Sequence, residues 1–379
     1  FIVYNQANYP NFTALLDHLK VPSVETHMSF AASVDNGGFE YSSDLRGLVG
    51  QKRNLARPGY WQMLADIVRF YNHAESLLDS PDIEGMTLGE FLTRHGYSPQ
   101  LVELHVLPMC AAIWSSSADA IRSFPMRSFI RFFSSHELFK LGRRALWRTV
   151  SGGSRSYVAA LVGDFAKPVR RAPGARAINR SGGLVTVEDV TGRRDVFTDV
   201  VMASHADQTL ALLDDADALE REVLGAFSYT NNRAVLHDDP GLMPRRKHVW
   251  ASWNYIGGED GSDALCVSYW MNRLQNLDRR HPIFLTLNPT REPKASSVLQ
   301  SYDYAHPLFD QAALSAQKQL WQLQGRHGTW FCGSYFGYGF HEDGLQSGLA
   351  VAENFGVARP WARPANRIAE APALLEAAE

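Results

Sequence analysis

Residues 329–353 read TWFCGSYFGYGFHEDGLQSGLAVAE, and three kinds of local structure follow one another within them. The apolar run that starts at Thr329 predicts a strand that ends at Gly333. A loop with two more glycines comes next, and apolar residues at helical spacing follow Glu342 and Asp343. A helix N-terminus behind a glycine loop presents unpaired N–H groups to an anion or a dipole. The pattern fits such a ligand-binding unit, and it also fits a strand–loop–helix unit that only packs.

The chain has 379 residues, of which 45% are hydrophobic, and a formal net charge of -3. A single core rarely grows to this size, so we expect two lobes. The weak negative charge provides no basic field for nucleic acid, and no apolar run is long enough to span a bilayer. The three cysteines, Cys110, Cys266 and Cys332, are too scattered for a disulfide framework or a metal site. They indicate a reducing compartment, and we expect a cytoplasmic protein.

The chain begins on Phe1-Ile2-Val3-Tyr4 and not on methionine. This apolar stretch is typical of the middle of a strand. We therefore expect that the natural N-terminus lies further upstream. The sequence contains no recognisable signal peptide.

The first 150 residues favour helices, with one β-hairpin near the beginning. Asp35 to Gly38, between two β-prone runs, predicts the turn of the hairpin. Tyr60 to Leu78 has the apolar spacing of an amphipathic helix. Thr87 followed by Glu90 predicts a capping box at the start of another helix. Further helices are expected as far as Trp147.

The segment from Arg127 to Arg148 carries six cations and a single acid, Glu137, interleaved with aromatic and aliphatic residues. One interpretation is a peripheral contact with an anionic membrane, to which each cation contributes about 1 kcal/mol. The other interpretation is an ordinary amphipathic helix pair with a solvated basic face.

A glycine-rich turn at Ser151 to Ser154 separates this region from a β-rich second half. Strands are expected at residues 169–172, 184–187, 195–198 and 199–203, and a helix from Ala206 to Leu213, which indicates an α/β lobe. A second group of strands is expected at residues 234–236, 249–255, 265–271 and 283–287. Aromatic and polar residues of this group suit one wall of a substrate pocket. They are Trp253, Asn254, Tyr255, Trp270 and Asn272.

Several kinds of catalytic site have no support in the sequence. There is no HExxH or HxxxH pair and no CxxC for a metal, no GxSxG nucleophile elbow, and no GxGxxG turn. His341-Glu342-Asp343 is a tight cluster of potential ligands. Adjacent residues at a helix start point in different directions, so we expect no metal site there.

Three pieces of the chain resemble the flavin-containing amine oxidase and phytoene-desaturase superfamily. They are the Val150–Ser154 turn with its helix, the segment from Pro168 through residues 199–205, and the C-terminal strand–loop–helix. The resemblance implies an α/β fold with a doubly wound, Rossmann-like FAD-binding domain that is discontinuous, and an inserted α+β substrate domain. It places residues 1–27, 150–214 and 325–359 in the FAD-binding domain, residues 28–149 and 215–324 in the substrate domain, and residues 360–379 in a tail.

The resemblance also implies that FAD binds non-covalently, because the loop expected at residues 301–309 has no cysteine. The superfamily's glycine-rich βα turn has no counterpart after Phe1. Val169 falls on the residue that contacts the adenine, and the C-terminal piece closes on the flavin and the pyrophosphate. Asp343 stands in place of the usual glycine, and Ser334 in place of a frequent aspartate. The implied cofactor-binding residues are Val169, Gly333, Ser334, Glu342, Asp343, Gly344 and Leu345.

Motifs along nearly the whole chain before residue 360 are similar to a subgroup of predicted bacterial FAD-dependent oxidoreductases. They include Tyr9-Pro10, Ala112 to Ser115, Ser252 to Tyr255 and Gly339 to Gly344. Related domains are joined to cyclopropane-fatty-acid synthases. This association implies dehydrogenation or another redox modification of fatty-acyl chains on phospholipid, with a synthase-like methyltransferase as a partner.

The expected reaction is hydride removal from an acyl-chain carbon, with the redox chemistry supplied by the flavin. The helix at Leu345 would stabilise negative charge on the flavin, and we expect Phe340 and His341 beside the ring. His341 is the candidate general base or polar contact, unless it only hydrogen-bonds to backbone. Two other functions stay open. One is a flavin amine oxidase, although Phe340 stands where a tyrosine is typical; the other is a non-catalytic partner that presents lipid to a methyltransferase or synthase.

Overall fold

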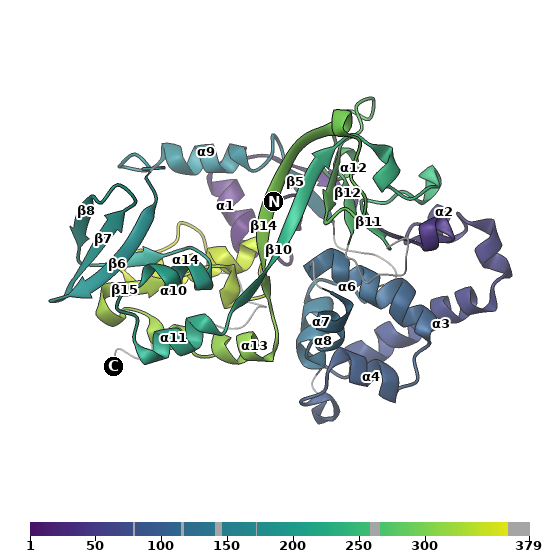
Figure 1. Ribbon diagram of the computed structural model, residues 1–379, viewed down its shortest axis with the longest axis horizontal. Helices are drawn as coiled ribbons and strands as arrows, with labels where there is room; N and C mark the ends of the chain where they lie inside the picture. Colours follow the sequence, from purple (N-terminus) through teal and green to yellow (C-terminus); the bar gives the residue numbers. More distant parts are fainter. Residues whose placement is uncertain (79, 115–116, 141–145, 172, 258–265, 363–379) are drawn as a thin grey trace.

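The computed structural model describes residues 1–78, 80–114, 117–140, 146–171, 173–257 and 266–362 as a mixed α/β structure (Figure 1). A small antiparallel sheet lies at one end of the molecule, and a group of helices lies at the other end. A larger sheet lies between them, and its two longest strands run through the middle of the view.

The larger sheet has seven strands in the order β14-β10-β13-β12-β11-β3-β4. They are β3 (Phe30–Val34), β4 (Phe39–Ser42), β10 (Ser228–His237), β11 (Trp253–Ile256), β12 (Val267–Trp270), β13 (Phe284–Leu287) and β14 (Val298–Leu308). β3 and β11 pair in parallel, and the other neighbours are antiparallel. The β3–β4 hairpin confirms the turn predicted at residues 35–38.

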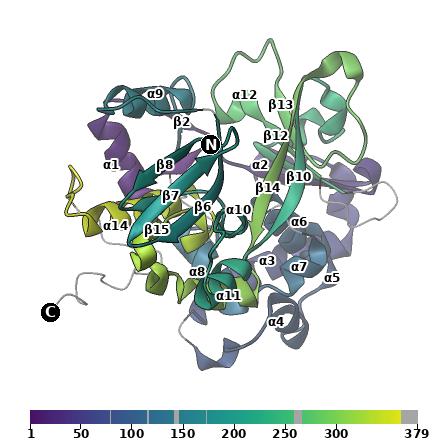
Figure 2. The same cartoon turned by 60° about the vertical axis from the view of Figure 1, so that its left-hand side comes forward.

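The predicted strand of the C-terminal motif is β15 (Thr329–Phe331), which pairs in parallel with β9 (Val200–Met202). Cys332 N–H donates to Met202 O over 2.9 Å on the β9 side. On the opposite edge, Phe331 N–H donates to Gln324 Oε1 over 2.9 Å, and Gln324 Nε2 donates to Phe331 O over 2.8 Å. The Gln324 side chain therefore satisfies the backbone hydrogen-bonding groups of Phe331 on the edge of β15 opposite to β9. The small sheet beside it consists of β6 (Ala175–Ser181), β7 (Leu184–Asp189) and β8 (Arg194–Phe197), as Figure 2 shows.

A third group of strands lies near the N-terminus. β1 (Tyr4–Asn5), β5 (Trp147–Val150) and β2 (Ser23–Thr26) form an antiparallel sheet in that order. Trp147 therefore lies in a strand, and the helix predicted there is wrong. Local spacing suggests a helix, but the pairing with two distant strands outweighs it.

Half of the α-helices in the described residues lie together beside the larger sheet. They are α2 (Leu45–Leu48), α3 (Pro58–Ser76), α4 (Leu88–Arg94), α5 (Pro99–Leu101), α6 (Leu107–Trp114), α7 (Ala118–Arg122) and α8 (Met126–Ser135). A π-helical turn, Val102–Val106, joins α5 to α6. The capping box predicted at Thr87 and Glu90 is confirmed at the start of α4. The remaining helices are α1 (Pro10–His18), α9 (Arg155–Gly163), α10 (Ala206–Leu212), α11 (Ala218–Gly225), α12 (Met271–Leu274), α13 (Gln311–Gln317) and α14 (His341–Asn354).

Buried side chains form three main clusters. The largest joins α3, α4, α6 and α8 to the larger sheet, and the smallest joins α1 to β5 and α9. The third contains side chains from β7, α11, α13 and β15. Since α11 and α13 share a core with β15, the block 215–324, which the sequence assigns to the substrate domain, contributes to two cores.

Two expectations about strands differ from the structure. Residues 169–171 lie outside any strand, residue 172 lies outside the described residues, and β6 begins at Ala175. The loop expected at residues 301–309 is the second half of β14, an eleven-residue strand. β14 is an edge strand whose residues are mostly exposed, so it lacks the alternation that identifies half-buried strands. Its Pro307 is compatible with an edge position.

A buried ion network joins β6 to α11. The Arg180 side chain is 3% exposed and donates to both carboxylate oxygens of Glu220, which is fully buried. It also donates to Asp215 Oδ1 over 2.9 Å. The single cation of Arg180 therefore compensates the buried Glu220 carboxylate and also pairs with Asp215, whose side chain is 30% exposed.

We predict that Arg180→Met lowers the free energy of unfolding by about 3–5 kcal/mol, because it leaves the Glu220 carboxylate buried without its cation. Urea denaturation measures the change. Arg193→Met is the control, since Arg193 and Asp195 form an exposed pair that contributes less than about 1 kcal/mol. Equal effects of the two substitutions would contradict the role of the network.

Candidate active site

The turn after β15 packs closely against the first turn of α14. Gly333 N–H donates to Ser347 Oγ over 2.9 Å, and this hydroxyl donates to Gly344 O over 2.9 Å. A Cβ on Gly333 would lie 2.5 Å from the Tyr335 ring, and one on Gly344 would lie 3.6 Å from Ser334 N. A side chain at Gly333 would therefore clash with Tyr335 of the same turn, whereas a Cβ at Gly344 would be at an ordinary van der Waals distance from the turn.

The Glu342 side chain connects α14 to the N-terminus of α1 by hydrogen bonds. Its carboxylate is fully buried and accepts from Asn11 N–H, Asn11 Nδ2 and Phe12 N–H at 3.0, 2.8 and 2.9 Å. Gln346 Nε2 donates to the same carboxylate over 3.1 Å. A carboxylate at the positive end of a helix is stabilised by its unpaired N–H groups. The side chain of this predicted cofactor residue is thus engaged by the protein itself.

The Asp343 side chain is buried, and its two carboxyl oxygens differ in the number of hydrogen bonds that they accept. Oδ2 accepts from Tyr338 N–H over 3.0 Å and from Phe340 N–H over 2.8 Å. Oδ1 is buried and has no hydrogen-bond partner among the described residues. Burial raises the pKa of Asp343 to about 7, with a further contribution from the charge of Glu342.

The N-terminus of α14 has backbone N–H groups without hydrogen-bond acceptors among the described residues. Gly344 N–H donates to Phe340 O over 3.2 Å. In the described part of the chain, no acceptor bonds to the N–H groups of His341 and Glu342. Together with the helix dipole, they form a place for negative charge. Leu345 packs against the cluster around α1, as Phe340 at the start of the helix does.

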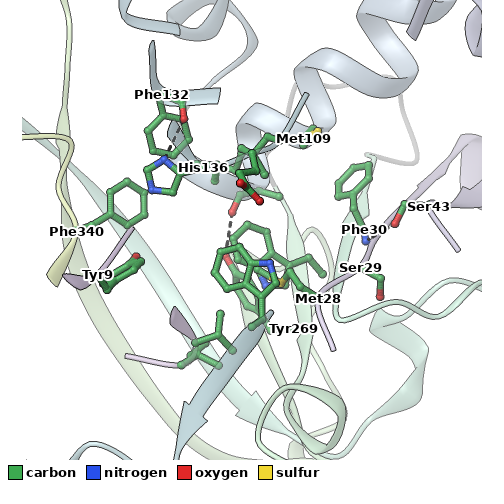
Figure 3. A pocket seen from close by; sticks show the side chains of 18 of the residues that line it. Tyr9, Met28, Ser29, Phe30, Ser43, Met109, Phe132, His136, Tyr269 and Phe340 are labelled. Atoms are coloured by element: carbon green, nitrogen blue, oxygen red, sulfur yellow. Dashed lines mark hydrogen bonds between the residues drawn. The ribbon is translucent and has the colours of Figure 1, made fainter. Parts of the chain in front are cut away.

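A largely apolar cavity of about 300 Å³ lies beside this helix end (Figure 3). Its size is at the lower limit of small-molecule sites, which span roughly 300–1,000 Å³. The cavity is lined by residues 1–3, 9, 28–30, 43, 71, 105, 109, 112, 113, 132, 136–138, 147, 253, 269 and 339–341. Phe340 and His341, the two predicted catalytic residues, are both part of the lining.

Phe340 lies against an aromatic and a histidine side chain that the sequence analysis did not single out. Its ring stacks on Phe132 with centroids 5.4 Å apart and 22° between the planes, and it lies 5.5 Å from the His136 ring. His136 Nδ1 donates to Phe132 O over 2.9 Å. Nε2 is then the acceptor nitrogen of the neutral ring. Burial lowers the pKa of His136 to about 4, so it is neutral at pH 7.

His341, the first residue of α14, lines the same cavity. Its ring lies 4.1 Å from the Phe1 ring and 6.1 Å from the Phe12 ring. Burial lowers the pKa of His341 to about 4. Like His136, it can accept a proton but carries no charge at neutral pH.

A chain of polar groups reaches the cavity from the π-helical turn. His105 Nδ1 and Nε2 each share a hydrogen bond of 2.7 Å with a tyrosine hydroxyl, the first with Tyr41 and the second with Tyr71. His105 and Tyr71 line the cavity. π-helical turns occur frequently at functional sites. A break in helical spacing at Pro108 is the only trace of this turn in the sequence.

Of the five residues predicted to form a pocket wall, one lines the cavity and four do not. Trp253 lines the cavity, and its indole N–H is buried without an acceptor among the described residues. The others lie outside this lining: Asn254 bonds to Ala251 and Ser268 within the sheet, and Asn272 bonds to Asp278, His281 and Ile283. Tyr255 packs in the main core, and Trp270 packs on Trp250. Strand alternation explains why Asn254, the next residue of β11, faces away from Trp253.

Val169 is 46% exposed and lies in the irregular segment between α9 and β6. No described contact joins it to the end of α14. The role of Val169 towards an adenine therefore stays a prediction.

The Arg127–Arg148 segment has its aromatic residues inside. Phe129, Phe132 and Phe133 are buried in α8. Arg127 pairs with Glu84 over 2.7 Å, and Arg148 donates to Ser23. Residues 141–145, including Arg143 and Arg144, lie outside the described residues. In the part of the chain that the structure describes, no helix combines the length and apolar character needed to cross a membrane, and no cluster of three metal-ligating side chains occurs.

Comparisons with solved structures identify the fold. The CLA-producing fatty acid isomerase from P. acnes has a TM-score of 0.66 and 13% identity, covering 94% of this chain and 86% of the isomerase. Cyclohexylamine oxidase from Brevibacterium oxydans has a TM-score of 0.63 and 10% identity, covering 94% and 88%. Putrescine oxidase bound to putrescine has a TM-score of 0.61 and 11% identity, covering 92% and 86%. No protein family and no curated protein sequence matches the chain.

The fold is therefore that of the FAD-binding, amine-oxidase type. It is an α/β fold with a discontinuous, doubly wound Rossmann-like domain and an inserted α+β substrate domain, as predicted. The residues present suit the polar end of a flavin. The α14 end supplies unclaimed N–H groups, Gly339 has a φ of 90°, and an apolar cavity lies directly beside them.

We predict that Asp343 makes stability depend on pH. Its folded pKa of about 7 exceeds the ordinary value of 3.8, so the folded state binds the proton more tightly. The free energy of unfolding then falls as pH rises from about 4 to about 7, by at most about 1.4 kcal/mol per pH unit. Asp343→Asn keeps the acceptor for Tyr338 and Phe340 and removes the titration.

The difference in unfolding free energy between the wild type and Asp343→Asn is the quantity to measure, by urea denaturation at several pH values. It should decline from pH 4 to 7 and stay constant above. A difference that does not change with pH would show that Asp343 keeps one protonation state.

Proposed function

We propose that the protein is an oxidoreductase that binds FAD non-covalently and dehydrogenates a fatty-acyl chain. The observation that carries the proposal is the position of the cavity. It is largely apolar and lies beside the N-terminus of α14, where the N–H groups of His341 and Glu342 have no acceptor among the described residues. The fold supports the cofactor, and the lining supports an apolar substrate. All three cysteines lie outside the lining of this cavity, which supports a non-covalent flavin.

When bound, the flavin would supply the hydride acceptor for this chemistry. The N–H groups of His341 and Glu342 would hold negative charge at the end of α14. Phe340 and Phe132 form an aromatic wall at which a substrate can lie flat. Because the cavity is largely apolar, it also excludes water from the reacting carbons.

Desaturation removes a hydride and a proton from neighbouring carbons, so the protein has to accept the proton. His136 Nε2 and the His341 ring are neutral acceptors within the lining. A general base of this kind contributes about a hundredfold to ten-thousandfold to the rate. We assign the proton to His136, since its Nδ1 bond to Phe132 O fixes the ring with Nε2 as the acceptor.

An amine substrate is the rival, and cyclohexylamine and putrescine oxidases share the fold. A buried ammonium requires a compensating carboxylate. Glu137 is the carboxylate in the described lining, and it already pairs with Lys140 over 2.8 Å. The lining therefore suits an acyl chain better than a cationic substrate.

The test of the function is the spectrum of the protein expressed from its complete reading frame, followed by anaerobic mixing with substrates. Oxidised flavin should be present, and fatty acids or phospholipids should bleach it while amines do not. Bleaching by amines with hydrogen peroxide release would favour the rival. A protein without flavin would refute the proposal and favour a lipid-presenting partner of a synthase-like methyltransferase.

We predict that His136→Gln slows anaerobic flavin reduction by the acyl substrate about a hundredfold or more, while flavin content is unchanged. His341→Gln tests the residue expected from the sequence in the same assay. His281→Gln, at an exposed position, is the control. If His136→Gln reduces its flavin as fast as the control does, His136 is not the base.

A further inference from the structure

The segment that follows β4 and extends into the first turn of α3 exposes large hydrophobic side chains at the end of the molecule that carries α2 (Figure 1). Leu45, Val49, Leu55 and Trp61 are 85%, 54%, 38% and 55% exposed. Trp61 Nε1 donates to Leu55 O over 2.9 Å, so these two residues lie together. Leu45 and Val49 are one helical turn apart. Scattered exposed hydrophobic residues are ordinary, but a cluster of this kind marks an interaction surface.

The same segment is positively charged. Between Leu45 and Trp61 it contains four exposed cations and no acid; the cations are Arg46, Lys52, Arg53 and Arg57. None of them forms an ion pair with a described residue, although Arg53 and Arg57 donate to Gly38 O. Asp44, directly before the segment, is neutralised by Arg273 at 2.7 Å.

A neighbouring turn adds to this charge. His248 Nε2 bonds to Gly50 O over 2.5 Å and holds the turn at residues 245–249 against the segment. Arg245 and Lys247 are exposed on this turn. Asp35 is an exposed acid of the β3–β4 turn nearby. Among the described residues of these elements, exposed cations therefore outnumber exposed acids.

We propose that this surface, defined as the exposed residues from Leu45 to Trp61 and called the basic tip, docks the protein on an anionic phospholipid membrane. Exposed tryptophan and leucine beside unpaired arginine and lysine match the interfacial region of a bilayer, where apolar groups enter and cations contact headgroups.

The basic tip is also adjacent in sequence to a residue that lines the cavity. Ser43 lines the cavity, and Leu45, two residues further on, is the most exposed hydrophobic residue of the tip. Met28 and Phe30 line the same region of the cavity, as Figure 3 shows for Phe30 and Ser43. A membrane held at the tip would thus present acyl chains near this part of the lining. The delivery of substrate rests on the proposed function, whereas the docking does not.

The test is flotation of the flavin-loaded protein with vesicles of phosphatidylcholine, with and without phosphatidylglycerol. Binding should require phosphatidylglycerol and weaken between about 0.1 M and about 1 M salt, where the Debye length falls from about 10 to about 3 Å. Arg53→Glu should weaken binding by at least about fivefold, which is the contribution of a single cation. Leu45→Ser with Trp61→Ser should weaken it by roughly tenfold or more, because it removes the apolar groups that enter the bilayer.

Matched controls address the alternatives. Arg131→Glu probes the Arg127–Arg148 face, and Val190→Ser with Val196→Ser removes hydrophobic residues that are 63% and 58% exposed at the opposite end. Both controls should bind vesicles within about twofold of the wild type. Three outcomes would each overturn the proposal. Arg131→Glu alone could abolish binding, or the tip variants could leave binding intact. The third outcome is that the protein self-associates and that Leu45→Ser with Trp61→Ser abolishes the self-association. Flavin content and substrate bleaching are measured separately, so a failure of docking is distinguishable from a failure of the function.

Discussion

The site depends on one buried carboxylate, that of Glu342. Residues 11 and 12 at one end of the chain donate three hydrogen bonds to it, and α14 at the other end carries it. A buried charge is stable only when hydrogen bonds replace its hydration, and here the start of α1 provides them. The bonds hold the start of α1 against α14. The apolar residues before α1 consequently line the same cavity as Phe340 and His341.

Two neighbouring acids illustrate how environment decides the role of a residue. Glu342 accepts four hydrogen bonds, whereas Asp343, next in the chain, accepts two on one oxygen and none on the other. Burial without full compensation raises the pKa of Asp343 to about 7. The first acid acts as a fixed anchor of structure. The second is a carboxyl close to its titration point that holds the backbone at Tyr338 and Phe340.

The sequence predicted those parts of the fold that local patterns encode. The β15–turn–α14 motif, the β3–β4 hairpin and the capping box at Thr87 all depend on residues close together in the chain. β14 was missed because an exposed edge strand has no alternating pattern, and β5 was misread because its partners are distant in sequence. The sequence places Phe340 and His341 at the start of the last helix, and both line the cavity there, while their catalytic roles stay predictions. His136 could not be found, since its position against Phe340 arises only when α8 packs on the α14 end.

The electrostatics of the cavity come from the backbone more than from charged side chains. Both histidines of the α14 end have a pKa of about 4, because an imidazolium would lose its hydration in an apolar cavity. The carboxylate in the lining, Glu137, is paired with Lys140. A fixed positive potential is therefore left at the N–H groups of His341 and Glu342, which do not titrate. These N–H groups stabilise negative charge at any pH, whereas the Asp343 carboxyl in the same helical turn loses its proton near pH 7 and then adds a negative charge to this end. The neutral histidines stay available as proton acceptors.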